Sequence, residues 1–273
     1  MYKRQILYRP TGESGDFEKA NFPIGVEGGK TSTCPTQNLM EAYDMKDGTP
    51  FVWNNQSNPY DNRDPRMKYT IVCNEMKWPV DPVEIWEGGT NGLPLQNATT
   101  TGYYLKKYVN NTISFEAGST VTKKQHNWVL FRYGEILLNY AEAMINAFHD
   151  PNYKDAVYNM SAREAVNQIR GRTNISLPGF PSDITEKDFV KRLKNERRVE
   201  LAFEGHRFWD VRRWKELGQT ANIYGVKITK NNEVISYEKF LLETRAVTDN
   251  MYFYPIPNTE RFKNPNLGQN PGW

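Results

Sequence analysis

Three glutamates at four-residue spacing are the residues of this sequence best suited to acid–base chemistry. Glu196, Glu200 and Glu204 lie in "KNERRVELAFEGHRFWDVRRW", the stretch from Lys194 to Trp214. Residues four apart share one face of a helix, and two carboxyl groups can together cleave a glycosidic bond. The interleaved arginines would keep these carboxylates ionised, because a nearby positive charge lowers the pKa of a carboxyl group. A structural role therefore fits the glutamates better than catalysis by a protonated acid.

The same stretch combines arginines with tryptophans, which is also a pattern of nucleic-acid binding. Each basic cluster stands beside carboxylates, however, and the net charge of the chain is only +3, so we expect no nucleic-acid partner. We predict a partly buried seam of ion pairs in which arginine stacks on tryptophan and bridges to acidic side chains. Besides the glutamates, the predicted seam contains Arg197, Arg198, Arg207, Trp209, Asp210, Arg212, Arg213 and Trp214.

Metal and cofactor chemistry have no sequence signature here. The three histidines, His126, His149 and His206, are widely separated and form no H-E-x-x-H motif. Cys34 and Cys73 show no C-x-x-C spacing, and they could form one disulfide or remain two free thiols. We therefore expect neither a metal site nor a cofactor.

Composition places the chain among globular proteins. Of its 273 residues, 38% are hydrophobic and 25% are charged, which is ordinary for a soluble domain. Mean hydropathy is −0.75, and no apolar run approaches the roughly 20 residues of a membrane span. The chain is rich in aromatic residues, with 16 Tyr, 13 Phe and 7 Trp, so many rings must lie at or near the surface.

Residues 128–217 are expected to form a helical core that positions the glutamates. Apolar residues repeat at helical spacing over 127–148 and again over 161–172, which predicts an antiparallel pair of helices. Small alanines in both would permit close packing, as in one tetratricopeptide unit. A third helix is predicted to begin at Thr185, where Thr185 and Asp188 resemble a capping box.

The flanking regions contain less regular structure. Residues 6–127 are rich in glycine and proline turns and are predicted to be mostly loop. Residues 218–273, which are rich in proline and asparagine, should wrap over the surface as irregular chain. The short elements expected within the first region are a helix over 35–45 and strands over 69–73 and 103–109.

The first five residues, Met1 to Gln5, match the translation of a transposase adapter end used in sequencing libraries. They also lack the basic and apolar regions of a signal peptide. We expect them to be an artefact, with the natural sequence continuing upstream, and sequencing the parent DNA across the junction tests this.

Five motifs in order resemble the SusD/RagB family. The Lys194–Trp214 stretch resembles the family's ER-x-x-E-x-x-x-EG-x-R-x-x-D-x-R-R-W motif. The other matching segments are "CPTQNLMEAYDMKDGTP", "YDNRDPRM", "FRYGEILLNYAEA" and "FYPIPNTERFKNPNLGQNPGW". Residues 6–32 and 74–127 match no fixed pattern.

The resemblance implies a mainly α fold, in which tetratricopeptide-type helix pairs support a loop-built binding face. It implies a lipoprotein on the outer membrane of Bacteroidetes-type bacteria, which binds oligosaccharides, polysaccharides or other nutrients and acts as a lid on a SusC-like TonB-dependent transporter. Family members are not enzymes. The family's N-terminal half, with its signal peptide, lipidated cysteine and most helical repeats, has no counterpart here, so we interpret residues 6–273 as a C-terminal portion.

The resemblance also assigns roles to individual residues. It gives the matched motif residues a part in the fold and none in ligand contact. They are Arg197, Arg198, Glu200, Glu204, Gly205, Arg207, Asp210, Arg213 and Trp214.

Aromatic residues on the loops are the candidates for a sugar-binding face. Sugars present apolar C–H faces and polar rims, so flat rings beside amide groups on variable loops suit them. Such rings can instead pack against neighbouring loops, and Trp128 is expected to be a core residue. The predicted site residues are Trp53, Asn54, Asn55, Tyr60, Trp78 and Trp86.

Two alternative functions remain open from the sequence. One is a glycoside hydrolase that uses the face of Glu196, Glu200 and Glu204. The other is a tetratricopeptide-type interaction module whose ligand is a protein. Loss of reducing-sugar release in Glu200→Gln would support the first, and partner binding unaffected by polysaccharide would support the second.

Overall fold

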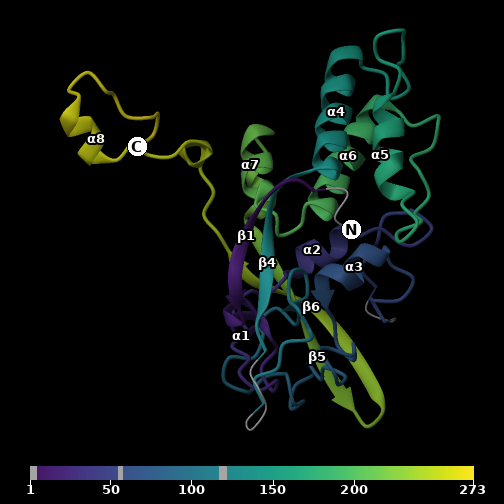
Figure 1. Cartoon of the computed structure of the whole chain (residues 1–273), viewed down its shortest axis with the longest axis vertical. Helices are drawn as coiled ribbons and strands as arrows, with labels where there is room; N and C mark the ends of the chain where they lie inside the picture. Colours follow the sequence, from purple (N-terminus) through teal and green to yellow (C-terminus); the bar gives the residue numbers. More distant parts are fainter. Residues whose placement is uncertain (1–4, 55–57, 117–121) are drawn as a thin grey trace.

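The protein has a helical part and a part built from loops and short strands. The structure is a computed structural model that describes residues 5–54, 58–116 and 122–273. Helices from the middle of the chain gather at the top of the view in Figure 1, and the loops and the long hairpin lie below them. The mainly α description thus suits the middle of the chain better than the whole.

The helical part follows the predicted order, except that the third helix ends at Glu200, so Glu204 lies in a turn and does not share a helix face with Glu196 and Glu200. Its helices are α4 (Tyr133–Phe148), α5 (Ala162–Arg170), α6 (Glu186–Glu200) and α7 (His206–Arg213). Ser161 caps α5 in a capping box with Glu164, and Thr185 caps α6 by accepting from the Asp188 amide. These caps fix both N-termini where the sequence placed them, because each satisfies backbone N–H groups that a helix start leaves unpaired.

Helix α4 begins later than its apolar pattern indicated. Residues 127–132 belong to the strand β4 (Lys124–Arg132), which pairs antiparallel with β1 (Gln5–Ser14). As a result Trp128 is not a core residue, and 54% of it is exposed. The alternation of the strand and the spacing of the helix coincide over these few residues, so periodicity did not separate them.

The loop-rich part contains only short elements. They are α1 (Asp16–Asn21), α2 (Gln37–Ala42), α3 (Pro65–Thr70), β2 (Ile71–Val72) and β3 (Tyr104–Leu105). Thr36 caps α2 by accepting from the Leu39 amide, and Asp64 caps α3 by accepting from the Arg66 amide. The two predicted strands pair with each other, but each is reduced to two residues.

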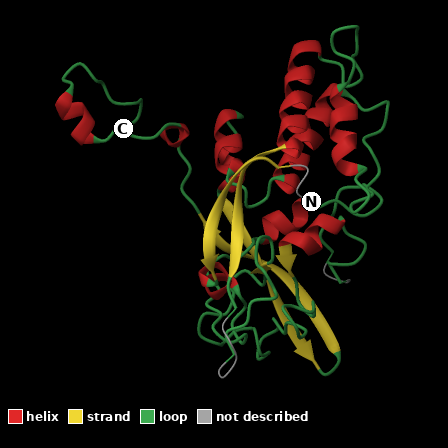
Figure 2. Cartoon of the chain, in the orientation of Figure 1, coloured by secondary structure: helices red, strands yellow, loops and turns green. Residues whose placement is uncertain are grey.

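The C-terminal region is not irregular throughout. After η2 (Leu217–Thr220), a hairpin of β5 (Asn222–Asn231) and β6 (Val234–Thr244) packs against the loops through the buried residues Val226 and Ile228. Only the chain beyond it, with η3 (Asp249–Tyr252) and α8 (Asn258–Lys263), is mostly irregular. In Figure 2 this last segment extends away from the rest of the molecule and does not wrap over it.

Two hydrophobic clusters form the core. The loop cluster lies beneath the loops and includes Met40, Met67, Tyr103, Tyr104 and Val199. The helical cluster lies between α4, α5 and α6 and includes Leu138, Ala141, Ala165, Ile169, Phe189 and Leu201. The buried alanines let α4 and α5 approach closely, as the sequence predicted. Helix α6 contributes to both clusters, so its charged side chains lie where the two parts meet.

Candidate functional site

Glu200 is the centre of a buried ion-pair network between the two clusters. Its neighbour Val199 belongs to the loop cluster, and its other neighbour Leu201 belongs to the helical cluster. Three arginines from distant segments surround its carboxylate. Arg66 donates to Oε2 at 3.0 Å, Arg172 to Oε2 at 2.6 Å and Arg132 to Oε1 at 2.7 Å. The network thus draws α3, the end of β4 and the loop after α5 onto α6.

The other two glutamates extend the same network. Glu196 pairs with Arg66 and accepts from Arg170 Nη1 at 2.7 Å. Glu204 accepts from Arg132 Nε and from Lys107 Nζ, both at 2.6 Å. All three carboxylates are therefore satisfied by charged donors, which is the arrangement that a buried charge requires.

The electrostatics disfavour acid–base catalysis by these glutamates. Burial alone would raise the pKa of Glu196 and Glu200, but the neighbouring arginines outweigh it and lower both pKa values. The pKa of Glu204 is lowered in the same way by Lys107 and Arg132. A glycosidase acid needs a carboxyl group that keeps its proton near neutral pH. These groups are ionised and enclosed, so the network has the properties of a structural lock.

The predicted seam is present only in part, because Arg198, Arg207 and Arg212 form no ion pair among the described residues and Trp209 is 60% exposed. Within that stretch Asp210 joins Arg197 at 2.8 Å and Arg213 at 2.9 Å, and Arg213 lies over the ring of Trp214. The cations that hold the glutamates come from elsewhere in the chain. Sequence reasoning missed Arg66, Arg132, Arg170 and Arg172. The matches around "RDPRM" and "FRYGE" contain two of these arginines and were the available signal.

Two of the predicted sugar-binding rings are buried in the loop cluster. Trp78 is 7% exposed and Tyr60 is 6% exposed. Lys106 covers the ring of Trp78 at 4.8 Å, and Tyr60 packs edge-on against Tyr103 and Tyr237. In this arrangement neither offers an open ring face to a ligand.

The remaining predicted residues lie closer to the surface. Trp86 and Trp53 are partly buried against the loop cluster, and Asn54 is exposed. Lys230 of β5 sits 4.2 Å above the ring of Trp86, while Trp53 meets Phe51 edge-on. Asn55 lies outside the described residues.

Other exposed rings were not predicted. Trp128 stacks on Tyr108 with 6.3 Å between ring centroids, on the face of the β1–β4 ribbon. On α7, Trp209 is 60% exposed, and its neighbour Phe208 stacks on Tyr254 of the C-terminal segment. The second contact joins α7 to the C-terminal segment.

The thiols, the acidic and histidine side chains and the lengths of the helices bear on disulfide, metal and membrane roles. Cys34 and Cys73 are both free thiols, which settles the alternative that the sequence left open. Across residues 5–54, 58–116 and 122–273, no cluster of three His, Cys, Asp or Glu side chains could hold a metal ion. Nor does any helix in those ranges have the length and apolarity to cross a membrane.

The fold resembles solved SusD-like structures. A SusD-like protein from Bacteroides fragilis aligns with a TM-score of 0.80 at 26% identity, covering 99% of this chain and 55% of that one. A SusD-like carbohydrate binding protein from the same species aligns with a TM-score of 0.76 at 25% identity, covering 97% of this chain and 54% of that one. The chain thus spans about half the length of these structures.

Sequence comparison gives the same family. Two Formosa agariphila proteins, SusD-like protein P2 and SusD-like protein P38, are 29% identical over 163 residues and 37% identical over 150 residues. The alignments cover 58% and 53% of this chain but only 28% and 24% of those relatives. The model of the SusD family matches residues 8–273. The chain therefore belongs to the SusD family.

Proposed function

We propose that this chain is part of a cell-surface protein that captures oligosaccharides or polysaccharides for a SusC-like TonB-dependent transporter of the outer membrane. The observation that carries the proposal is the family match over residues 8–273. The likeness to a Bacteroides fragilis structure described as carbohydrate binding supports the ligand class. Binding would be non-covalent and need no cofactor, with delivery to the transporter following capture.

The loops around Trp86 and Trp53 are the proposed sugar-binding face. Both rings are anchored on the loop cluster and are still partly exposed, and Asn54 adds an exposed amide beside Trp53. A ring held in this way can stack on a sugar face at little cost in conformational entropy, and on Trp86 the sugar would take the place of the exposed Lys230 side chain above the ring. Trp78 and Tyr60 would act from below, by keeping these loops in place.

The helical part would provide the rigid support. We propose that α4 and α5 form one tetratricopeptide-type pair, because buried alanines from both helices lie in a single cluster. The glutamate network then ties this pair to the loops, because Arg132 and Arg172 share Glu200 with Arg66 of α3. Loops held on such a scaffold can vary in sequence while keeping their position.

Calorimetric titration with neutral soluble polysaccharides tests the proposal. The 273-residue chain is first checked for a cooperative thermal melt, and each glycan is then titrated into it. We expect one glycan class to bind and Trp86→Ala or Trp53→Ala to weaken it at least about tenfold, the loss of a stacking contact. Trp209→Ala is the matched control, since it removes an exposed tryptophan far from these loops. A folded chain that binds none of the glycans contradicts the proposal that these loops suffice.

A further inference from the structure

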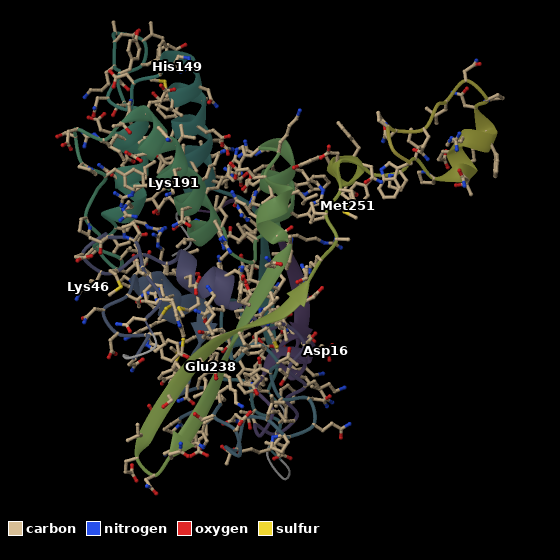
Figure 3. All side chains as sticks on the ribbon, turned by 180° about the vertical axis from the view of Figure 1, so that it is seen from behind. Asp16, Lys46, His149, Lys191, Glu238 and Met251 are labelled. Carbon is tan, nitrogen blue, oxygen red and sulfur yellow. The ribbon has the colours of Figure 1, made fainter. Side chains whose placement is uncertain are left out.

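A cavity of about 460 Å³ lies on the side of α6 that faces α2. Its walls come from α2, the loop over residues 44–51, the outer face of α6 and the segment from Arg207 to Gln219. Figure 3 labels Lys191, one of the lining residues on α6, and Lys46 in the segment after α2. Among the described residues predicted to bind sugar, which are Trp53, Asn54, Tyr60, Trp78 and Trp86, none lines it.

The lining carries more positive than negative charge. It contains six cationic side chains, Lys187, Lys191, Arg192, Lys194, Arg198 and Arg207, and four carboxylates. Each carboxylate already has a cationic partner within the protein. The pairs are Glu41 with Lys239, Asp44 with Arg170, Glu196 with Arg170 and Glu216 with Lys194. These acids therefore leave part of the positive charge uncompensated.

Four of the lining cations have no carboxylate within ion-pair distance among the described residues: Lys187, Lys191, Arg198 and Arg207. The two arginines make one neutral hydrogen bond each in that part of the chain. Arg198 donates to the Asn38 carbonyl at 2.8 Å, and Arg207 donates to Gln219 Oε1 at 2.8 Å. Each guanidinium therefore keeps several donors without an acceptor among the described residues, and none of these donor atoms is fully buried, so a ligand can reach them.

Burial makes the missing counter-charge costly. It lowers the pKa of Arg198 to about 10, with the positive charge of Arg207 as the next cause, and it also lowers the pKa of Arg207. A partly desolvated cation gains more from a paired anion than from a neutral acceptor. By contrast, the arginines of the glutamate network all have carboxylate partners.

We propose that this cavity binds an oxyanion group, a carboxylate, sulfate or phosphate, held by Arg198 and Arg207, its two partly buried arginines without a carboxylate partner in the described part of the chain. The planar guanidinium fork matches an oxyanion geometrically, and the exposed Lys187 and Lys191 attract it to the opening. The family resemblance gives the two arginines a part in the fold, and anion binding adds a second role. The oxyanion reaches the site either as a free inorganic ion or on an acidic saccharide.

Titration calorimetry with sodium sulfate and with sodium glucuronate tests this at constant ionic strength, with sodium chloride as the balancing salt. We expect at least one to bind with a single site, and Arg207→Gln to weaken it about tenfold or more, as for one lost charge-assisted hydrogen bond. The pair Lys187→Gln and Lys191→Gln changes only exposed residues and should weaken binding with an unchanged melting temperature. Lys19→Gln is the matched control, because Lys19 is an exposed lysine on α1, outside the cavity.

The outcomes separate the sources. Binding of sulfate alone assigns the cavity to inorganic oxyanions, and binding of glucuronate alone assigns it to acidic saccharides. Absence of binding by both ions overturns the proposal, as does equal weakening by Lys19→Gln and by the two cavity lysine substitutions. The neutral glycans that test the proposed function carry no oxyanion, so the two proposals fail independently.

Discussion

Arg66 and Glu200 lie 134 residues apart in the sequence, yet Arg66 Nη1 donates to Glu200 Oε2 at 3.0 Å in the interior of the protein. Arg66 is followed by Met67 of the loop cluster, and Glu200 is followed by Leu201 of the helical cluster. Opening either cluster alone would leave a buried charge without its partner. The pair therefore couples the stability of the two parts of the molecule.

Removing the charge of Glu200 should destabilise both parts together. In Glu200→Gln, three arginines lose a shared carboxylate, so we expect the free energy of unfolding to fall by about 3–5 kcal/mol. Urea denaturation followed by far-ultraviolet circular dichroism measures this. Glu186→Gln is the matched control on the same helix, because its partner His149 is exposed, and it should change stability by less than about 0.5 kcal/mol. Similar losses in the two variants would contradict a network of this kind.

The network also predicts how stability depends on pH. Arginine pairing lowers the folded-state pKa of Glu196 and Glu200 below the usual value of 4.5, despite burial. A depressed carboxyl pKa contributes stability that is complete above the unfolded-state pKa and is lost as pH falls toward the folded-state pKa. Burial raises the pKa of Asp44 in spite of Arg170, so this group acts in the opposite direction.

We therefore expect the urea midpoint to fall as pH drops below about 5, since the depressed glutamates outnumber the one raised aspartate. Midpoints at a series of pH values check this, and Glu200→Gln should show a shallower fall. An unchanged midpoint between neutral pH and about pH 4 would show that these carboxylates are not held ionised by the fold.

Local signals in the sequence were enough to place the helical part. Ser161 and Thr185 mark the starts of α5 and α6, because a cap acts within one turn of the chain. The partners of Glu200 could not be found in this way, since Arg66 and Arg132 approach it only after folding. A seam of ion pairs could thus be predicted from the glutamates, but the cations that complete it could not.

Strands were harder to predict, because their partners are distant or their signals weak. Strand β4 pairs with β1 more than a hundred residues earlier, and residues 127–132 also suit a helix. The β5–β6 hairpin turns at Asn232, whose φ of 53° is left-handed. An asparagine between two apolar runs is typical of such a turn and could have indicated the hairpin. The richness of the following residues in proline and asparagine concealed it.

The candidate sugar-binding residues could be recognised by type but not by exposure. A tryptophan beside proline gives the same sequence pattern whether it is exposed or buried. Trp78 is buried because of chain segments that pack around it only in the folded structure. Trp128 shows the opposite case, because its place on a two-stranded ribbon leaves it open to solvent.

Docking of the hairpin onto the loops should depend on Gly102. Its φ is +82°, and a Cβ atom there would lie 2.4 Å from the carbonyl oxygen of Val226 on β5. Gly102→Ala should therefore reduce the free energy of unfolding by about 1–3 kcal/mol, since backbone must move. Gly218→Ala, with nothing within 4 Å of the added atom, should change it by less than about 0.5 kcal/mol. Equal stability of the two variants by urea denaturation would argue against this docking.

The two thiols should differ in reactivity. Cys73 is fully enclosed, and burial raises its pKa to about 12, while Cys34 is partly exposed with a pKa that burial raises less far. Because the thiolate is the reactive form, Ellman's reagent should modify Cys34 slowly and Cys73 only upon unfolding. The variant Cys34→Ser isolates Cys73 and should release no colour until urea is added. If Ellman's reagent detects neither thiol of the parent chain in urea without a reductant, the two cysteines are instead joined in a disulfide.

Substitutions of Trp78 and of Trp86 should have different effects on stability and on glycan binding. Trp78 is enclosed by the loop cluster, so Trp78→Ala leaves a cavity, and we expect it to reduce the free energy of unfolding by about 3–5 kcal/mol. Trp86 is only partly buried against the cluster, so Trp86→Ala should reduce the free energy of unfolding by clearly less. Urea denaturation of both variants measures the difference. Trp78→Phe is included because phenylalanine fills most of the cavity that alanine would leave.

The glycan titration then shows whether Trp78 supports the loops or contacts the sugar directly. If Trp78 acts only from below the loops, Trp78→Phe should restore most of the stability and also the glycan affinity, because the loops regain their support. Trp86→Phe should keep the stability of the parent chain yet bind more weakly, since the smaller ring offers less area for stacking. Loss of binding in a fully stable Trp78→Phe variant would instead place the Trp78 ring in direct contact with the sugar and would require the loops to open on binding.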